Sequence, residues 1–146
     1  MELKQYLNRA WSVYKKLSVK KAHLDSLSNV ISKYGEREIE TYPTGNSSET
    51  QAIRWSELKK ECDDLEWRLL SIDRETDTIL RRLTNSNQYQ VLYLRYVRRL
   101  SWADIPEALH YSKQNVYKLH KDGLDELDRI TGYVDWQDEK GASNDE

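Results

Sequence analysis

The amino-acid sequence predicts an all-α protein, with a long N-terminal pair of helices followed by a C-terminal helix-turn-helix domain. Glycine and proline, the residues that most often interrupt helices, occur only five and two times in 146 residues. Apolar residues recur at steps of three and four along most of the chain, which is the spacing of one helix face. Hydrophobic residues make up 38% of the chain and charged residues 33%, so each helix can bury only one side.

The first expected helix runs from Leu3 to Tyr34. Apolar residues recur every seven positions along it, and Gly35 supplies a signal for its C-terminal end. The heptad positions are Leu3, Ala10, Leu17, Leu24 and Ile31. Residues 36–48 contain Pro43 and Gly45 and have no sustained periodicity, so we expect a loop there.

The second expected helix begins at Ser48, a good N-cap residue, and continues to Leu83. Its apolar seam consists of Trp55, Leu58, Cys62, Leu65, Leu69, Ile72, Thr76, Ile79 and Leu83. Both helices have about 34 residues and would each be about 50 Å long, so they can close as an antiparallel hairpin. Alternatively, the second helix pairs with its copy in another chain. Because one hairpin leaves half of each broad stripe exposed, we expect residues 1–84 to oligomerise, with a four-helix dimer as the natural completion.

Three shorter helices follow a polar break at residues 84–87. The first has Leu92, Tyr96 and Leu100 on its buried side, with Arg95, Arg98 and Arg99 expected together on the opposite side. Ser101 and Asp104 form a capping-box-like start to a short helix with Trp102, Ile105 and Leu109 turned inward. His110 and Tyr111 make a turn, and Ser112 caps the last helix. Its expected inner side is Val116, Leu119, Gly123, Leu127 and Ile130.

The outer side of this last helix carries groups that can recognise DNA. Two helices joined by a short turn are typical of a helix-turn-helix, whose second helix enters the major groove. Gln114 and Asn115 can each pair with adenine, while Lys113 and Lys118 can donate to guanine or to phosphate. The predicted DNA-binding residues are Lys113, Gln114, Asn115, Tyr117, Lys118, Lys121, Arg95, Arg98 and Arg99.

These residues also carry a family resemblance. Residues 91–96 (VLYLRY), 100–105 (LSWADI) and 111–120 (YSKQNVYKLH) resemble the region-4 helix-turn-helix of sigma factors. They are more similar still to bacteriophage transcriptional regulators of the RinA and ArpU type, over about 40 residues. The resemblance implies a phage or prophage late-gene activator that binds promoter DNA without catalysis, with residues 112–122 as the recognition helix. Host RNA polymerase is a further partner that this role implies.

Two residues depart from the family pattern. Pro106 lies where a small helix-forming residue is usual, and a proline beyond the first turn of a helix would bend it or delay its start. Gly123 replaces the usual alanine, which in a helix interior costs about 1 kcal/mol. Neither departure removes the face that reads bases.

Charge and composition narrow the class of protein. The formal net charge is −2, but residues 85–124 form a basic segment, and residues 133–146 are expected to be a mostly disordered acidic tail. Phosphate-binding glycine loops, nucleophile elbows and HExxH motifs are absent from the sequence, which disfavours an enzyme, and no cofactor is expected. His23, His110 and His120 are scattered, so no metal site is expected. The single cysteine, the basic start and the lack of a long apolar run favour a cytoplasmic protein without a membrane span.

Two other functions remain open at this point. One is a DNA-packaging component like a phage small terminase subunit, although those usually carry the DNA-binding motif at the N-terminus. The other is an adaptor that binds RNA polymerase through the helix-turn-helix and does not touch DNA. For both, as for a regulator, a homodimer or higher homo-oligomer is expected.

Overall fold

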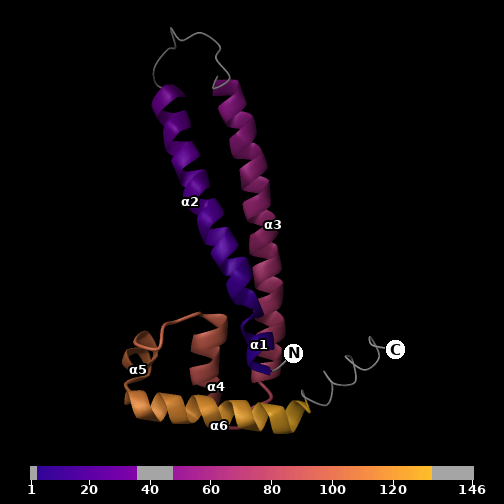
Figure 1. The fold of residues 1–146 in the computed structure, drawn as a ribbon, viewed down its shortest axis with the longest axis vertical. Coiled ribbons are helices and arrows are strands. Elements are labelled where there is room, and N and C mark those ends of the chain that lie inside the picture. Colours follow the sequence, from indigo (N-terminus) through magenta and orange to yellow (C-terminus); the bar gives the residue numbers. More distant parts are fainter. Residues whose placement is uncertain (1–2, 36–47, 133–146) are drawn as a thin grey trace, which may run out of the picture. The chain divides into compact units, whose positions relative to one another are not determined.

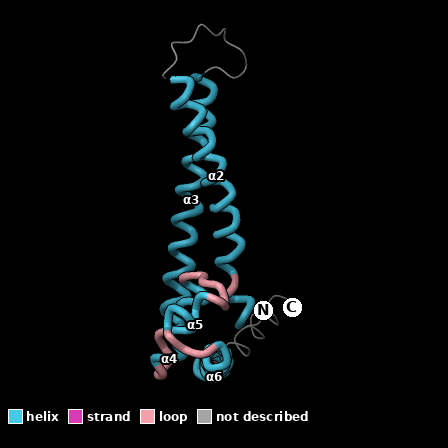
Figure 2. The backbone as a smooth tube through the Cα atoms, turned by 90° about the vertical axis from the view of Figure 1, so that its left-hand side faces the viewer, coloured by secondary structure: helices cyan, strands magenta, loops and turns pink. Residues whose placement is uncertain are grey.

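The computed structural model describes residues 3–35 and 48–132, and all regular structure in these ranges is helical (Figure 1). Figure 2 shows the same backbone with only helices and loops in the described part. The predicted all-α class is therefore confirmed for these residues. The expected loop at residues 36–48 lies, up to residue 47, outside the described residues, as does the expected tail at 133–146. The chain divides into two compact units, one of residues 12–70 and one of residues 1–11 and 71–146.

Two long helices make up the unit of residues 12–70. They are α2 (Arg9–Gly35) and α3 (Ser48–Leu80), whose ends extend into the other unit. Side-chain contacts show that the helices run antiparallel, because residues 20 and 21 of α2 contact residues 61 and 66 of α3, whereas the later residue 28 of α2 contacts the earlier residue 55 of α3. These contacts are Lys20–Glu61 at 2.8 Å, Lys21–Glu66 at 2.7 Å, and the Trp55 Nε1–H donating to Ser28 Oγ at 2.6 Å. The apolar seam lies between the two helices, with Leu17, Leu24, Leu58, Cys62 and Leu69 buried.

The expected continuous helix over residues 3–34 is wrong at Asn8. The chain instead forms α1 (Leu3–Leu7), a turn at Asn8, and then α2. The Trp11 N–H bonds to the Asn8 carbonyl at 3.0 Å, a three-residue step that replaces the normal four-residue step. Asparagine favours such breaks because its side chain competes for backbone groups. The break accompanies the packing of Leu3 and Leu7 into the core formed by the C-terminal helices.

Four shorter elements follow α3 in the second unit. They are α4 (Ser86–Leu92), a π-helical segment η1 (Tyr93–Val97), α5 (Asp104–Leu109) and α6 (Lys113–Thr131). One buried cluster joins α1, the end of α3, α4, η1 and α6 through Leu3, Leu7, Leu80, Leu83, Leu92, Tyr96, Val97 and Leu127. A second cluster joins α4, α5 and α6 through Val91, Ile105 and Val116. The sequence-based domain boundary at residue 84 thus falls inside one compact unit, because α1 and the end of α3 share a core with α6.

Neither unusual residue disrupts these helices. Pro106 is the third residue of α5, within the first turn, where its missing N–H has no intrahelical partner to lose. Its carbonyl accepts the Tyr111 N–H at 3.0 Å, so it helps to close the following turn. Gly123 is buried where α6 meets α4, and an added Cβ there would lie 2.9 Å from Leu92 Cδ1. Because it has no side chain, Gly123 allows this close approach between the two helices. From the sequence pattern, the glycine was expected only to destabilise the helix.

Candidate nucleic-acid interface

The first three turns of α6 present an exposed polar surface, which we call the α6 surface. Ser112 has the extended backbone of an N-cap, and its Oγ accepts the Asn115 N–H at 3.1 Å, which confirms the predicted cap. The opposite side of α6 is anchored by buried Val116, His120, Gly123 and Leu127. The α6 surface comprises Lys113, Gln114, Asn115, Tyr117, Lys118 and Lys121, and all six are exposed.

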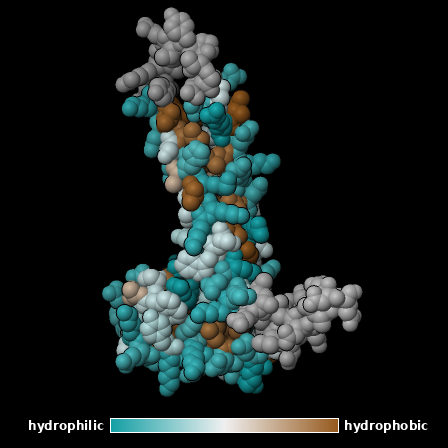
Figure 3. Space-filling model, viewed as in Figure 1, coloured by the Kyte–Doolittle hydropathy of each residue, from teal (hydrophilic) through white to brown (hydrophobic). Residues whose placement is uncertain are grey.

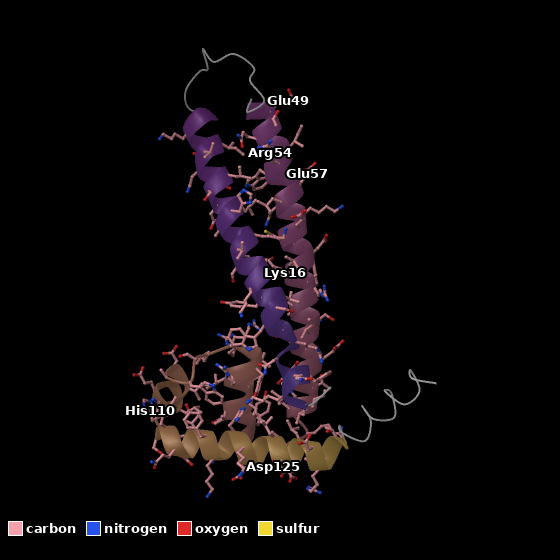
Figure 4. The ribbon with its side chains drawn as sticks, in the orientation of Figure 1. Lys16, Glu49, Arg54, Glu57, His110 and Asp125 are labelled. Carbon is pink, nitrogen blue, oxygen red and sulfur yellow. The ribbon has the colours of Figure 1, made fainter. Side chains whose placement is uncertain are left out.

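The α6 surface carries the three lysines of α6, and the other cation of this helix, Arg129, pairs with Glu126. Within the described ranges, none of the ion pairs involves Lys113, Lys118 or Lys121. From Asp122 onward the helix is mainly acidic, and Asp125, labelled in Figure 4, lies one turn beyond Lys121 on the same side. The positive end of the helix dipole adds to the attraction for anions at the Ser112 end. An anionic partner is therefore attracted to the N-terminal half of α6 and repelled by its C-terminal half.

Tyr117 is the aromatic member of the α6 surface, and its position is fixed by Trp102. The two ring centroids are 5.1 Å apart, and the Tyr117 side chain stays 47% exposed. Trp102, which was expected to turn inward, packs against the second cluster with Val91, Ile105 and Val116. Trp102 begins the turn that leads into α5, which places it beside α6. Trp102 contacts the Tyr117 ring on one side and leaves the other side accessible to solvent.

The three arginines near residue 97 do not form the single exposed face that the α-helical spacing predicted. The Arg98 N–H bonds to the Tyr93 carbonyl at 3.0 Å, a five-residue step, and Arg99 has a positive φ of 57°. This π-helical geometry shifts the register, so that residues expected on one side are separated. Of the three, only Arg98 is exposed.

Arg95 and Arg99 are instead held inside the protein. The Arg95 guanidinium lies 4.7 Å from the Trp102 ring centroid and 5.4 Å from that of Trp11, and its Nη1 donates to the Leu100 carbonyl at 2.9 Å. Arg99 pairs with Asp73 at 2.8 Å, and the two side chains are only 13% and 15% exposed. Both arginines therefore stabilise the fold. Their predicted contact with phosphate is not supported by these positions.

A buried polar pair beneath the α6 surface was not foreseen. The Tyr96 hydroxyl and His120 Nε2 are hydrogen-bonded at 2.7 Å, and both residues are nearly inaccessible to solvent. Burial, with the nearby charges of Lys4 and Arg95, lowers the pKa of His120 to about 4, so the imidazole is neutral at pH 7. Burial raises the pKa of Tyr96 to about 12. His120 lies four residues after Val116, so its inward position was already implicit in the helical spacing.

Comparison with known proteins adds no further assignment. No protein-family model, curated protein or solved structure matches the chain. In residues 3–35 and 48–132, no group of three or more His, Cys, Asp or Glu side chains is placed to hold a metal ion. Among the helices that the structure describes, none has the length and apolarity needed to span a membrane. The α6 surface is therefore the feature of the described residues that bears on function.

Proposed function

We propose that the chain is a sequence-specific DNA-binding protein that inserts the N-terminal half of α6 into the major groove. On this proposal α5, the turn at residues 110–112 and α6 form a helix-turn-helix, with residues 112–122 as the recognition helix. Three features of the turn support it. His110 adopts the left-handed conformation that ends α5, Ser112 caps α6, and only three residues separate the two helices.

The exposure of the whole α6 surface is the observation that carries the proposal. A major groove is about 12 Å wide and admits one helix, whose N-terminal residues reach the base edges. The Gln114 amide can donate to and accept from one adenine, and Lys118 lies one turn further along the same side. Tyr117, held by Trp102, can contact a thymine methyl group through its exposed ring. Lys113 and Lys121 flank these groups and suit the phosphate backbone.

We further propose that this binding regulates transcription. The resemblance to phage late-gene activators supports this role, and the paired long helices suit a protein that positions its DNA-binding part within a larger assembly. The chain would then act in the cytoplasm of a bacterial host and contact host RNA polymerase at the promoter. A DNA-packaging role and a role as a polymerase adaptor without DNA contact are the alternatives that the experiments separate.

The first test measures binding to a generic labelled duplex by fluorescence anisotropy as salt concentration is varied. We expect the full chain to bind at low salt and the triple variant Lys113→Ala, Lys118→Ala, Lys121→Ala to lose most of that affinity. Loss of two or three phosphate contacts, depending on whether Lys118 meets a phosphate or a base, should also reduce the slope of log affinity against log salt by about 1.8 to 2.7.

A matched variant controls for the loss of charge alone. Lys15, Lys16 and Lys33 are exposed on α2, and replacing all three by alanine removes the same net charge from another helix. This control should bind DNA nearly as the parent does. If both triple variants lose affinity equally, the interaction reflects net charge only, and α6 is not the DNA-binding element.

A further inference from the structure

The outer side of α3 carries large apolar side chains that have no partner in the described structure. Trp67 is 70% exposed and Leu70 is 41% exposed. The seam with α2 is on another side of α3, where Cys62, Leu69 and Thr76 are buried. Trp67 and Leu70 are exposed and therefore do not belong to this seam. Figure 3 shows hydrophobic side chains exposed among hydrophilic ones along α2 and α3 on the face in view. An exposed tryptophan beside an exposed leucine is typical of an interaction surface.

The sequence around this pair is symmetric in its chemistry. Six residues at alternating steps of three and four share one side of the continuous helix α3. In order they are a cation, an anion, two apolar residues, a cation and an anion, namely Lys60, Asp63, Trp67, Leu70, Arg74 and Asp77. We call this set the α3 outer face. When it is laid antiparallel on a copy of itself, every residue meets one of complementary character.

We infer that the α3 outer face binds the same face of a second copy of the chain, with the two α3 helices antiparallel. A two-fold axis between residues 68 and 69 pairs Trp67 with Leu70 of the second copy and Asp63 with its Arg74. The same register brings Lys60 to Asp77. An isologous interface requires a self-complementary surface, and this symmetry favours a second copy over an unrelated partner.

The ion pairs present in the single chain do not oppose this association. Asp63 contacts Lys59 at 3.1 Å on the exposed surface, and such exposed pairs contribute little, so this pair can be exchanged for one with Arg74 of the second copy. Asp77 is 22% exposed, with Oδ2 bonded to Arg81 at 2.8 Å and Oδ1 accepting the Tyr89 hydroxyl at 2.7 Å. Lys60 of the second copy would add to these contacts of Asp77 without replacing them. Within the described ranges, no ion pair involves Lys60 or Arg74, and both are exposed.

This interface differs from the one that the sequence pattern predicted. That prediction used the halves of the two apolar stripes that one hairpin leaves exposed or, as the alternative, the pairing of the second helix with its copy. In the structure the α3 seam is buried against α2 of the same chain. The α3 outer face is left for the second copy. The inference does not depend on DNA binding, so it and the proposed function can fail separately.

Sedimentation velocity of the full chain from about 1 to 100 μM tests the inference. We expect a monomer–dimer equilibrium that Trp67→Ser weakens at least about tenfold, since a central tryptophan carries much of the energy of an interface. The control is Val19→Ser on α2, which removes a side chain that is 71% exposed and lies outside the proposed contact. It should leave the equilibrium unchanged. A parent chain that is monomeric at 100 μM, or equal effects of the two variants, would overturn the inference.

Charge reversal tests the antiparallel register. Asp63→Arg alone places two arginines opposite each other twice in the dimer, and Arg74→Asp alone does the same with aspartates. Each variant should therefore dimerise at least about tenfold more weakly. An equimolar mixture of the two should form a heterodimer, because every contact is then between opposite charges. If the mixture stays monomeric while circular dichroism shows both variants folded, the proposed pairing is wrong.

Discussion

At the residue scale, Gly123 allows α4 and α6 to approach closely. An alanine Cβ at this position would lie 2.9 Å from Leu92 Cδ1 and 3.3 Å from Gln88 Cβ. Leu92 is fully buried, so its side chain has little room to move away. Alanine would gain about 1 kcal/mol in helix propensity, but overpacking of a core costs about 1 to 3 kcal/mol.

We therefore expect Gly123→Ala to lower the free energy of unfolding by up to about 2 kcal/mol in urea titrations. In a Leu92→Ala background the obstructing methyl group is gone, and the same substitution should stabilise the protein instead. A higher free energy of unfolding for Gly123→Ala in the parent background would show that the contact with Leu92 is not limiting.

Protonation of His120 makes the free energy of unfolding depend on pH. Its pKa of about 4 in the folded chain lies below the value of about 6.5 for an unfolded histidine. As pH falls below 6.5, the unfolded chain takes up a proton that the folded chain does not, so stability is lost. Between pH 7 and pH 5 this should lower the free energy of unfolding by about 2 kcal/mol.

Urea titrations at pH 7, 6 and 5 of the parent and of His120→Gln measure this contribution. Glutamine does not titrate, so the variant should lose less stability than the parent over this range, whatever its stability at pH 7. Equal losses in the two proteins would place the pH dependence elsewhere.

Side-chain hydrogen bonds could be predicted from the sequence where they depend only on neighbouring residues of the chain. Ser112 caps α6 as predicted, and Ser101 Oγ accepts the Asp104 N–H, although the N-cap residue of α5 is Ala103. Both bonds depend only on residues three positions apart. Arg99 was misplaced because its partner Asp73 is distant in sequence and could be identified only from the folded chain. Arg95 was misplaced although Leu100 and Trp102 are close to it in sequence, because the π-helix changes the helical register.

At the element scale, periodicity predicted that helices form and which side each buries, but not where they break. The seam residues of α2 and α3 are buried or half-buried as expected, since spacing alone fixes the side of a helix. The break at Asn8 and the π-helix at Tyr93–Val97 were not predicted. Both irregularities adapt the backbone to tertiary packing. A π-helix has one extra residue in a turn, and a single extra residue does not clearly alter the spacing of apolar residues in the sequence.

The N-cap of α6 is the local feature on which the α6 surface most depends. Ser112→Ala removes the acceptor of the Asn115 N–H and should lower stability by about 1 kcal/mol in thermal unfolding. It should also raise hydrogen exchange in the first turn of α6, where Lys113 and Gln114 lie. Ser112→Asn preserves a capping side chain and is the control. If the alanine and asparagine variants are equally stable, the cap contributes nothing measurable.

At the scale of the whole molecule, the distribution of charge matters more than the net charge of −2. Residues 133–146 contain five carboxylates and one lysine, while the α6 surface contains three lysines. Acidic side chains in the same molecule lower its attraction for DNA. Truncation after Gly132 should therefore raise affinity for a generic duplex by roughly 3- to 10-fold at low salt and steepen its decline with salt. Anisotropy titrations that show unchanged affinity would mean that this segment does not affect DNA binding.

Selection of binding sites from a random duplex pool tests most directly whether α6 reads DNA sequence. The parent chain should enrich a defined sequence at fixed salt. On that sequence, Gln114→Ala should cost about 1 to 3 kcal/mol and relax the preference at one base position, while Lys121→Ala should weaken all sequences nearly alike. If the parent enriches no sequence at any salt, or Gln114→Ala keeps both the motif and the affinity, then α6 does not read bases and contact with a protein partner becomes the better explanation of its surface.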